Sequence, residues 1–315
     1  MSAPTSPPGV PVGASMSFIV TNDEATKPSA PLGVVTVTYS PGHHLAEFLD
    51  SLASGYSGET YVVLADNGST DGVPQAAARA ERVEFLSTGG NLGYGAAINA
   101  AARVLSPMRE RGEINDEFFL ISNPDVTFSA GAVDELVACA RRWESAGSVG
   151  PRIVEADGST YPSARSVPTL GVGIGHALLS QIWPGNPFSA RYRADADMSH
   201  ERTAGWLSGS CVLVRWSAFE EVGGFDERYF MYLEDVDLGD RLGRAGYDNV
   251  YTPLARIHHD QGHSTKSRRH SMLPAHHRSA YRFLADRYRA WWQAPLRFLL
   301  AAGLKARGFL LTRVG

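Results

Sequence analysis

The stretch GVVTVTY, residues 33–39, decides the fold. Its β-branched residues are typical of a strand that is buried on both faces of a parallel sheet. Apolar residues at helical spacing follow at residues 43–52, and the stretch YVVLA, residues 61–65, indicates a second buried strand. A strand, a helix and a second strand in this order predict a right-handed βαβ unit.

The alternation of strand and helix continues along the chain and predicts an α/β fold with a mostly parallel sheet. In such sheets ligands bind beyond the carboxyl ends of the strands, so polar clusters at those ends are candidate site residues. An irregular segment, residues 155–205, is expected to be mobile or to face a substrate. Further strands are predicted at residues 83–86, 118–121, 149–154, 210–215 and 249–251, and further helices at 96–104, 132–143, 216–222 and 234–246.

The composition indicates a globular protein, because 43% of the 315 residues are hydrophobic and 20% are charged. The net charge of −4 argues against nucleic acid as the main partner, since duplex-binding proteins are usually basic. From Thr265 onward, however, eleven Lys and Arg residues accompany a single carboxylate, Asp286. A basic segment on an acidic body favours contact with an anionic surface such as lipid head groups.

The two cysteines and the two ends of the chain carry weaker signals. Cys139 and Cys211 lack CxxC spacing, which indicates reduced thiols in a cytosolic protein. Residues 1–31 show no signal-peptide pattern and are predicted to form a flexible leader. Residues 281–311 mix Trp, Phe and Leu with Arg too closely for a spanning helix. They predict either an amphipathic helix in a membrane interface or a helix packed on the body or in a dimer.

Two polar clusters follow predicted strands. Asp66 opens the run DNGSTDG, where a carboxylate can accept hydrogen bonds from a base or a ribose; a plain turn with a helix cap is the alternative. Asp125 ends the run SNPD, where it can hold a hard cation that bridges a diphosphate; an ordinary β-turn is the alternative.

Acidic and imidazole side chains form two further clusters. Glu234, Asp235 and Asp237 follow an aromatic run, and such carboxylates raise one another's pKa or recruit a cation. One of them can act as a general base, whereas Asp237 can simply complement the start of a helix. His258 and His259 can bind a metal or lie in a solvated loop.

The order of these motifs resembles the family 2 glycosyltransferases of GT-A fold. The ordered set covers about residues 32–265 and comprises DNGSTDG (66–72), GNLGYGAAIN (90–99), NPD (123–125), GGFDE (223–227), YLEDVDL (232–238) and HxxGxS (259–264). The resemblance implies a Rossmann-like, mostly parallel sheet flanked by helices, with an acceptor-side subdomain and a C-terminal amphipathic helical extension. It divides the chain into a leader (1–31), a nucleotide-sugar-binding half (32–155), an acceptor-binding and catalytic half (156–265) and basic C-terminal helices (266–315).

The resemblance also assigns donor-binding residues. Thr38 and Asp66 match positions that hold the nucleotide base and ribose. Asn91 and Asn99 match a segment that borders the diphosphate and sugar. Asp125 matches the last carboxylate of a DxD-type metal site.

Further positions match the chemical and acceptor residues of the family. Asp235 matches the catalytic base and Glu234 its acidic neighbour. His259 matches a histidine that completes the metal shell. Trp206 matches an aromatic position that stacks on the acceptor sugar, with core packing as the alternative. The sequence departs from the family where Asn123 replaces the first carboxylate of the metal site, which puts the metal affinity in doubt.

The chain looks most like the rhamnosyltransferase branch and its mycobacterial type. This implies inverting transfer of L-rhamnose from dTDP-rhamnose to N-acetylglucosamine on a polyprenyl diphosphate, for a cell-wall linker. It also implies Mg²⁺ or Mn²⁺, a peripheral place on the cytoplasmic face of the plasma membrane, and leaves a homodimer open.

Three alternatives to this activity stay open. The first is the same reaction with a UDP-hexose donor. A sugar nucleotidyltransferase would normally carry a basic, glycine-rich loop after the first strand, but Tyr39–His43 contains no Lys or Arg. A carbohydrate-binding module would need no acidic pair.

Overall fold

The computed structural model describes residues 30–169, 197–260 and 269–313. Four strands at the N-terminal side run parallel and lie in the order β3-β2-β1-β4. They are β1 (Leu32–Thr38), β2 (Thr60–Asp66), β3 (Val83–Ser87) and β4 (Phe118–Ser122). The carboxyl ends of these strands therefore meet at one edge of the sheet, as the sequence predicts.

The sheet continues beyond β4 without a break, in the order β4-β11-β6-β12-β5. The added strands are β11 (Cys211–Arg215), β6 (Ala146–Val154), β12 (Asp248–His259) and β5 (Val126–Phe128), with β7 (Thr160–Tyr161) and β9 (Arg202–Ala204) beside them. A separate two-stranded sheet pairs β8 (Ala164–Arg165) with β10 (Trp206–Leu207). The halves predicted at residues 32–155 and 156–265 thus share one ten-stranded sheet.

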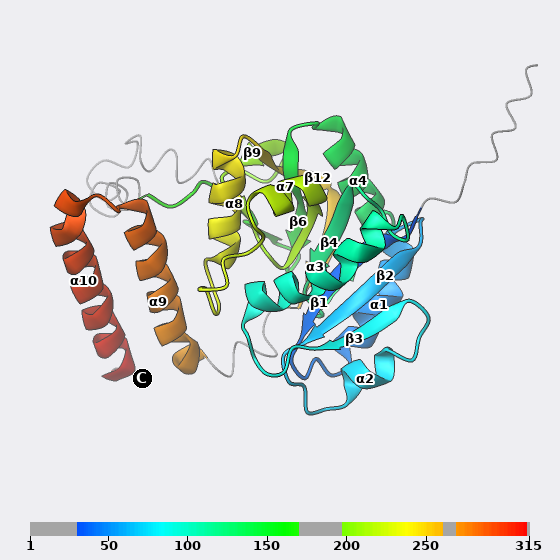
Figure 1. The fold of residues 1–315 in the computed structure, drawn as a ribbon, viewed down its shortest axis with the longest axis horizontal. Coiled ribbons are helices and arrows are strands. Elements are labelled where there is room, and N and C mark those ends of the chain that lie inside the picture. The colour runs from blue at the N-terminus through cyan, green and yellow to red at the C-terminus, as the bar shows by residue number, and fades with distance from the viewer. Residues whose placement is uncertain (1–29, 170–196, 261–268, 314–315) are drawn as a thin grey trace, which may run out of the picture.

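Helices cover both faces of this sheet (Figure 1). One face packs on α1 (His44–Gly55) and α4 (Ala132–Arg142), and the other on α3 (Tyr94–Glu110), α7 (Trp216–Glu221) and α8 (Glu234–Arg244). The short α2 (Val73–Ala77) follows β2. Side chains of β1 alternate between the two cores, with Leu32 and Val34 in one and Val35 in the other. Burial on both faces explains the uninterrupted apolar run that opens the fold.

One strand prediction is too short. The sequence predicts a strand at residues 249–251 followed by a loop that carries the histidines, but β12 continues to His259. Pro253 is the residue that argues for a stop, since proline removes a ladder hydrogen bond. The pairing of β12 with β6 shifts register between Thr252 and Arg256, and this irregularity accommodates the proline. His263 and the leader at residues 1–29 lie outside the described residues.

Of the two alternatives that the sequence leaves open for the C-terminal helices, packing on the body holds for α9, and the membrane contact stays a prediction. Helix α9 (Arg269–Arg287) packs on the body, where Phe283 is buried against Tyr229 and Val236. The short η2 (Trp291–Gln293) and α10 (Ala294–Arg313) follow it. Up to Gly303, where the described side chains of this part end, the exposed large apolar residues are Trp291, Trp292, Phe298 and Leu299. Within the described residues, no helix combines the length and the hydropathy that a membrane span requires.

Both cysteines are buried thiols without a disulfide. Cys139 lies on α4 and faces the core, and Cys211 opens β11. Burial raises the pKa of each thiol to about 12. Both are therefore protonated and unreactive at neutral pH.

Candidate active site

Thr38 and Asp66 lie side by side at the carboxyl ends of β1 and β2. The Thr38 hydroxyl donates to Asp66 Oδ1 at 2.7 Å, and the amides of Gly68 and Ser69 donate to Oδ2 at 3.2 and 3.0 Å. The Ser69 hydroxyl also donates to this carboxylate. Asp66 thus organises the turn after β2, and its four donors occupy the usual acceptor positions of a carboxylate. Its predicted contact with a nucleotide stays a prediction.

The next loop at this edge carries Asn91. Asn67, buried after β2, donates to the carbonyl of Gly93 at 3.1 Å and accepts from Thr88 at 2.9 Å. The Asn91 side chain is exposed and accepts from the Gly93 amide at 3.1 Å. The loop at residues 88–93 is therefore held to the end of β2 by Asn67, and Asn91 on this loop faces solvent.

Asp125 and His259 meet between β5 and β12. His259 Nε2 lies 3.1 Å from Asp125 Oδ1, and the Asp260 amide donates to the Asp125 carbonyl at 3.1 Å. Pairing of Val126 with His259 holds the two side chains together. A carboxylate oxygen and an imidazole nitrogen this close can both turn toward one divalent cation, so the donor set fits the predicted metal. Two protein ligands leave most of the coordination shell to other oxygens, such as phosphates.

The Ser208–Ser210 segment joins this pair to the acidic cluster. The Asn123 amide donates to the Ser210 carbonyl at 2.8 Å, and the Gly209 amide donates to Asp235 Oδ2 at 3.1 Å. Gly209 also lies close to two side chains of the site, because a Cβ there would lie 3.3 Å from Tyr94 Cε1 and 3.4 Å from Asp235 Cβ. The structure therefore brings the segment around Asp125 and the acidic cluster to the same edge of the sheet.

Glu234 and Asp235 have different surroundings although they are neighbours. Glu234 is buried, and its Oε2 atom has no hydrogen-bond partner within the described part of the chain. Burial, followed by the charge of Asp235, raises the pKa of Glu234 to about 8. Burial also raises the pKa of Asp235, but the amides of Gly209 and Val236 oppose this effect. The two amides therefore favour the ionised form of Asp235, whereas Glu234 Oε2 has no such donor and burial favours its neutral form.

Tyr94, at the start of α3, is a site residue that the sequence analysis does not single out. Its hydroxyl donates to the Gly209 carbonyl at 2.6 Å. Burial raises its pKa well above the ordinary value, and the charges of Glu234, Asp235 and Asp125 add to this effect. Tyr94 thus stays protonated, within electrostatic reach of the three carboxylates. Its position depends on contacts with residues more than one hundred positions away, which no local pattern reveals.

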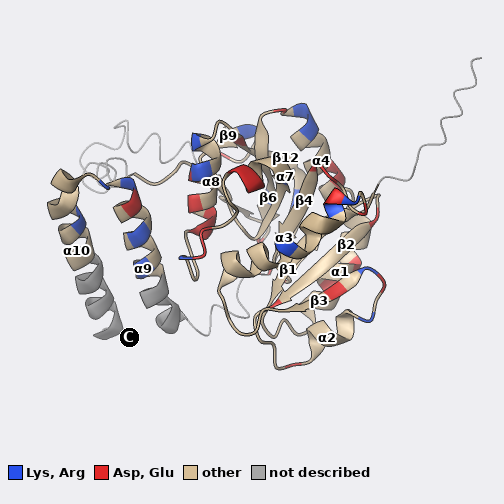
Figure 2. Ribbon diagram, in the orientation of Figure 1, with Lys and Arg blue, Asp and Glu red and all other residues tan. Residues whose placement is uncertain are grey.

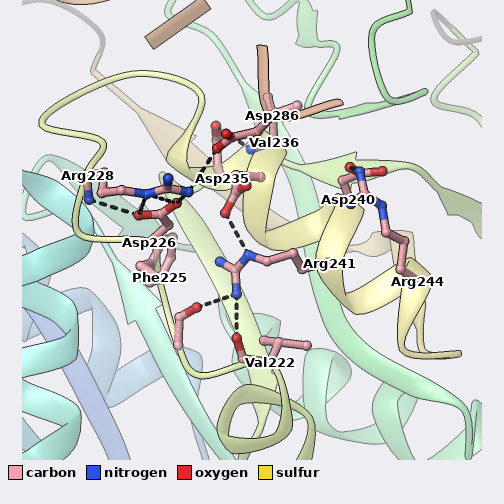
Figure 3. A network of polar contacts seen from close by, with 12 residues as sticks. Val222, Phe225, Asp226, Arg228, Asp235, Val236, Asp240, Arg241, Arg244 and Asp286 are labelled. Carbon is pink, nitrogen blue, oxygen red and sulfur yellow. Dashed lines mark hydrogen bonds and ion pairs between the residues drawn. The ribbon is translucent and has the colours of Figure 1, made fainter. Parts of the chain in front are cut away.

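Asn99 and Arg241 fix the loop before the acidic cluster. Asn99 bonds both backbone groups of Phe225, at 2.8 and 2.9 Å, and donates to Glu227 at 3.1 Å. Arg241 donates to the carbonyls of Val222 and Gly224, both at 2.7 Å (Figure 3). Asn99 is buried and its amide is used within the protein, so its predicted contact with the donor stays a prediction.

Trp206 and Asp237 have structural partners. The Trp206 indole donates to the Ser166 carbonyl at 3.2 Å, and its side chain packs against Gly239 of α8. Asp237 lies in the first turn of α8 and pairs with Arg241 at 2.7 Å. Both contacts agree with the structural alternatives named for these residues, and stacking of Trp206 on a sugar stays a prediction.

A second set of metal-type side chains lies at the start of α1. His43, His44 and Glu47 place their ligand atoms within 4.8 Å of one another. The His44–Glu47 contact measures 3.6 Å. No motif in the sequence analysis includes this group, and no described contact joins it to Asp125 or Asp235.

Comparison with known families agrees with this geometry. Residues 33–223 match the model of glycosyl transferase family 2, and residues 189–307 match glycosyl transferase family group 2. N-acetylglucosaminyl-diphospho-decaprenol L-rhamnosyltransferase of Mycobacterium tuberculosis is 53% identical over 285 residues, which cover 90% of this chain and 93% of the relative. Rhamnosyltransferase WbbL of Escherichia coli is 26% identical over 80% of this chain and 92% of its own.

Solved structures share the fold. Mannosyltransferase PcManGT of Pyrobaculum calidifontis, in complex with GDP-Man and Mn²⁺, superposes with a TM-score of 0.55 at 18% identity, over 90% of this chain and 71% of its own. S. aureus TarS in complex with UDP-GlcNAc gives 0.53 at 14% identity, over 90% and 74%. The fold is therefore of GT-A type, and the chain belongs to glycosyl transferase family 2 as a glycosyltransferase.

Proposed function

We propose that the protein transfers L-rhamnose from dTDP-rhamnose to a hydroxyl of N-acetylglucosamine carried on a polyprenyl diphosphate, in the assembly of a cell-wall linker. The observation that carries the proposal is the identity of 53% with the M. tuberculosis enzyme of that name over nearly the whole of both chains. The structure supports it through Asp235, whose carboxylate accepts from two backbone amides at the sheet edge that also holds Asp125.

The proposed reaction is a single displacement with inversion. Asp235 accepts the proton of the acceptor hydroxyl as its oxygen attacks the anomeric carbon, and the bond from that carbon to the diphosphate breaks on the opposite face. The amides of Gly209 and Val236 favour the ionised form of Asp235 and fix the position of its carboxylate before the reaction. Neutral Glu234 adds no second negative charge, so the diphosphate is not repelled twice.

The donor lies, in this proposal, along the edge that runs from Thr38 and Asp66 past Asn91 and Asn99 to Asp125. Asp125 and His259 would hold Mg²⁺ or Mn²⁺, which neutralises charge that develops on the leaving diphosphate. The solved relatives with Mn²⁺ support the choice of a divalent cation. On the acceptor side, Trp206 offers an indole beside the β8–β10 sheet.

A membrane contact completes the proposal. An acceptor on a lipid carrier requires the enzyme at a bilayer, and Trp291, Trp292, Phe298 and Leu299 are exposed beside Arg289 and Arg297. Aromatic and basic side chains together suit the interface of an anionic leaflet. We place this contact on the cytoplasmic face, where nucleotide sugars are made.

The test is transfer by the full-length enzyme with Mn²⁺ and a synthetic N-acetylglucosaminyl-diphosphate lipid. dTDP-rhamnose and UDP-hexoses are offered in separate reactions, and the anomeric configuration of the product is read by NMR. We expect rhamnosylated lipid of inverted configuration. Transfer from a UDP-hexose alone would refute the donor, and release of pyrophosphate from a nucleoside triphosphate would favour a nucleotidyltransferase.

A further inference from the structure

Helix α9 contacts residues 228–240, the segment that carries Glu234 and Asp235, at several points along its length. The Ser279 hydroxyl donates to the Met231 carbonyl at 2.9 Å, and the ring of His276 lies 5.6 Å from that of Tyr232. One turn further along α9, Phe283 is only 4% exposed. It packs in a cluster whose other members are Tyr229, Val236, Leu233, Trp206, Val167 and Leu284.

Ion pairs extend the contact at both ends of this segment. Asp286 accepts from Arg228 at 2.8 Å (Figure 3). Arg287 donates to Asp240 at 2.9 Å. Charges of both signs line α8 and α9 (Figure 2). The Arg228 side chain is 52% exposed, so its pair contributes little, whereas the side chain of Asp240 is only 10% exposed. The buried contacts of α9 with the body are therefore those of Ser279 and Phe283 together with the Arg287–Asp240 pair.

The segment under α9 has a strained backbone. Tyr232 and Leu233 have φ values of +67° and +64°, in the left-handed region that non-glycine residues rarely adopt. Two such residues in succession turn the chain directly into Glu234 and Asp235. Conformations of this kind persist only where surrounding contacts hold them. The described contacts from outside the segment to Met231, Tyr232 and Leu233 include those of α9.

We propose that α9 positions the catalytic base: Ser279 and Phe283 hold the Met231–Leu233 turn so that the Asp235 carboxylate stays against the Gly209 amide. The proposal rests on the proposed role of Asp235 as base. None of these α9 residues touches substrate in this scheme, and they act through the turn. The C-terminal region is then part of the catalytic unit and not merely an attachment to the body.

The experiment compares Phe283→Ala and Phe283→Leu with Tyr281→Ala in the full chain. Tyr281 is an exposed aromatic on the same helix and serves as the matched control. We expect Phe283→Ala to lower kcat at least about tenfold, because displaced catalytic groups cost rate steeply. The KM for dTDP-rhamnose should stay within about twofold, since the donor edge is untouched. Phe283→Leu should restore most of the rate, and Tyr281→Ala should match the wild type.

A second measurement makes the result independent of activity. Amide hydrogen exchange of residues 231–236, recorded well below the unfolding temperature of every variant, should accelerate in Phe283→Ala and not in Tyr281→Ala. Unchanged exchange in that segment, or an unchanged kcat, would overturn the inference. A parallel loss of donor affinity would also overturn it, because that indicates general damage to the fold. If the wild-type chain transfers no sugar, the proposed function fails while the exchange result still decides the role of α9.

Discussion

Asp235 and its neighbour Glu234 differ in the partners of their carboxylates. Two backbone amides stabilise the charge on Asp235, whereas Glu234 is buried without any described partner for Oε2. The Asp235→Asn variant should therefore lose about 10²–10⁴-fold in kcat, the usual contribution of a general base. Donor affinity measured by calorimetry should stay unchanged. Glu234→Gln, which mimics the neutral acid, is the control and should keep most of its activity at pH 7. Equal losses in both variants would contradict this division of roles.

The raised pKa of Glu234 also predicts how stability depends on pH. Between the ordinary pKa of a glutamate and about 8, the folded chain binds a proton that the unfolded chain releases. Stability contributed by this group therefore falls as pH rises through that window, with a slope of up to about 1.4 kcal/mol per pH unit. Glu234→Gln should remove this slope. Thermal unfolding from pH 5 to pH 9 should show the variant gaining on the wild type at high pH, and parallel curves would reject the assignment.

Asp125 and His259 define the metal prediction. Asp125→Ala and His259→Ala should each weaken Mn²⁺-dependent donor binding, by about tenfold or more for loss of one ligand. His258→Ala is a matched control, because His258 is exposed on the same strand and its side chain lies on the opposite face of β12 from that of His259. Titration of Mn²⁺ in the presence of donor measures the effect. If His258→Ala weakened binding as much as His259→Ala, the pair would not be the cation site.

At the scale of elements, the start of α3 docks on the catalytic segment through a glycine. Gly93 has φ of +88°, and a Cβ there would collide with the Phe230 carbonyl oxygen, which also accepts from the Tyr94 amide at 3.1 Å. Gly93→Ala should therefore destabilise the fold by about 2–4 kcal/mol, from backbone strain and overpacking together. Gly89 has a similar φ of +78° but open space around it. Gly89→Ala should cost only the strain, so comparable losses in denaturant unfolding would rule out the contact.

The sequence predicts the elements of this fold better than the contacts between them. Strands such as β1 follow from local pattern because both of their faces are buried. Pattern failed at β12, where Pro253 suggests a stop that a register shift in the sheet overrides. The motifs also indicate which acidic residues belong together. They could not reveal the hydrogen bond from Tyr94 to the Gly209 carbonyl or the hydrogen bonds of Asn99 to Phe225, because these contacts join residues far apart in the chain.

At the scale of the whole molecule, the C-terminal helices combine a docked half and an exposed half. Truncation after Arg278 would remove Phe283 and Arg287, so it would disturb the site as well as any membrane contact. Point variants at the exposed end avoid this. Trp291→Ser together with Trp292→Ser should reduce sedimentation with anionic vesicles several-fold, since each buried aromatic contributes roughly 1.5–3 kcal/mol. Activity on a short-chain soluble acceptor should stay unchanged. Undiminished sedimentation would instead favour a role of this surface in a dimer, which size measurements in solution would reveal.

The protonated, buried state of Cys139 and Cys211 has a practical use. A maleimide label added to the folded protein should leave both native thiols untouched, and these are the chain's two cysteines. A cysteine introduced at an exposed position such as Leu299 would then carry the dye by itself. Its fluorescence could report depth in a bilayer, and a second label near α8 could follow movement of the helical hairpin during turnover, with no need to build a cysteine-free background first.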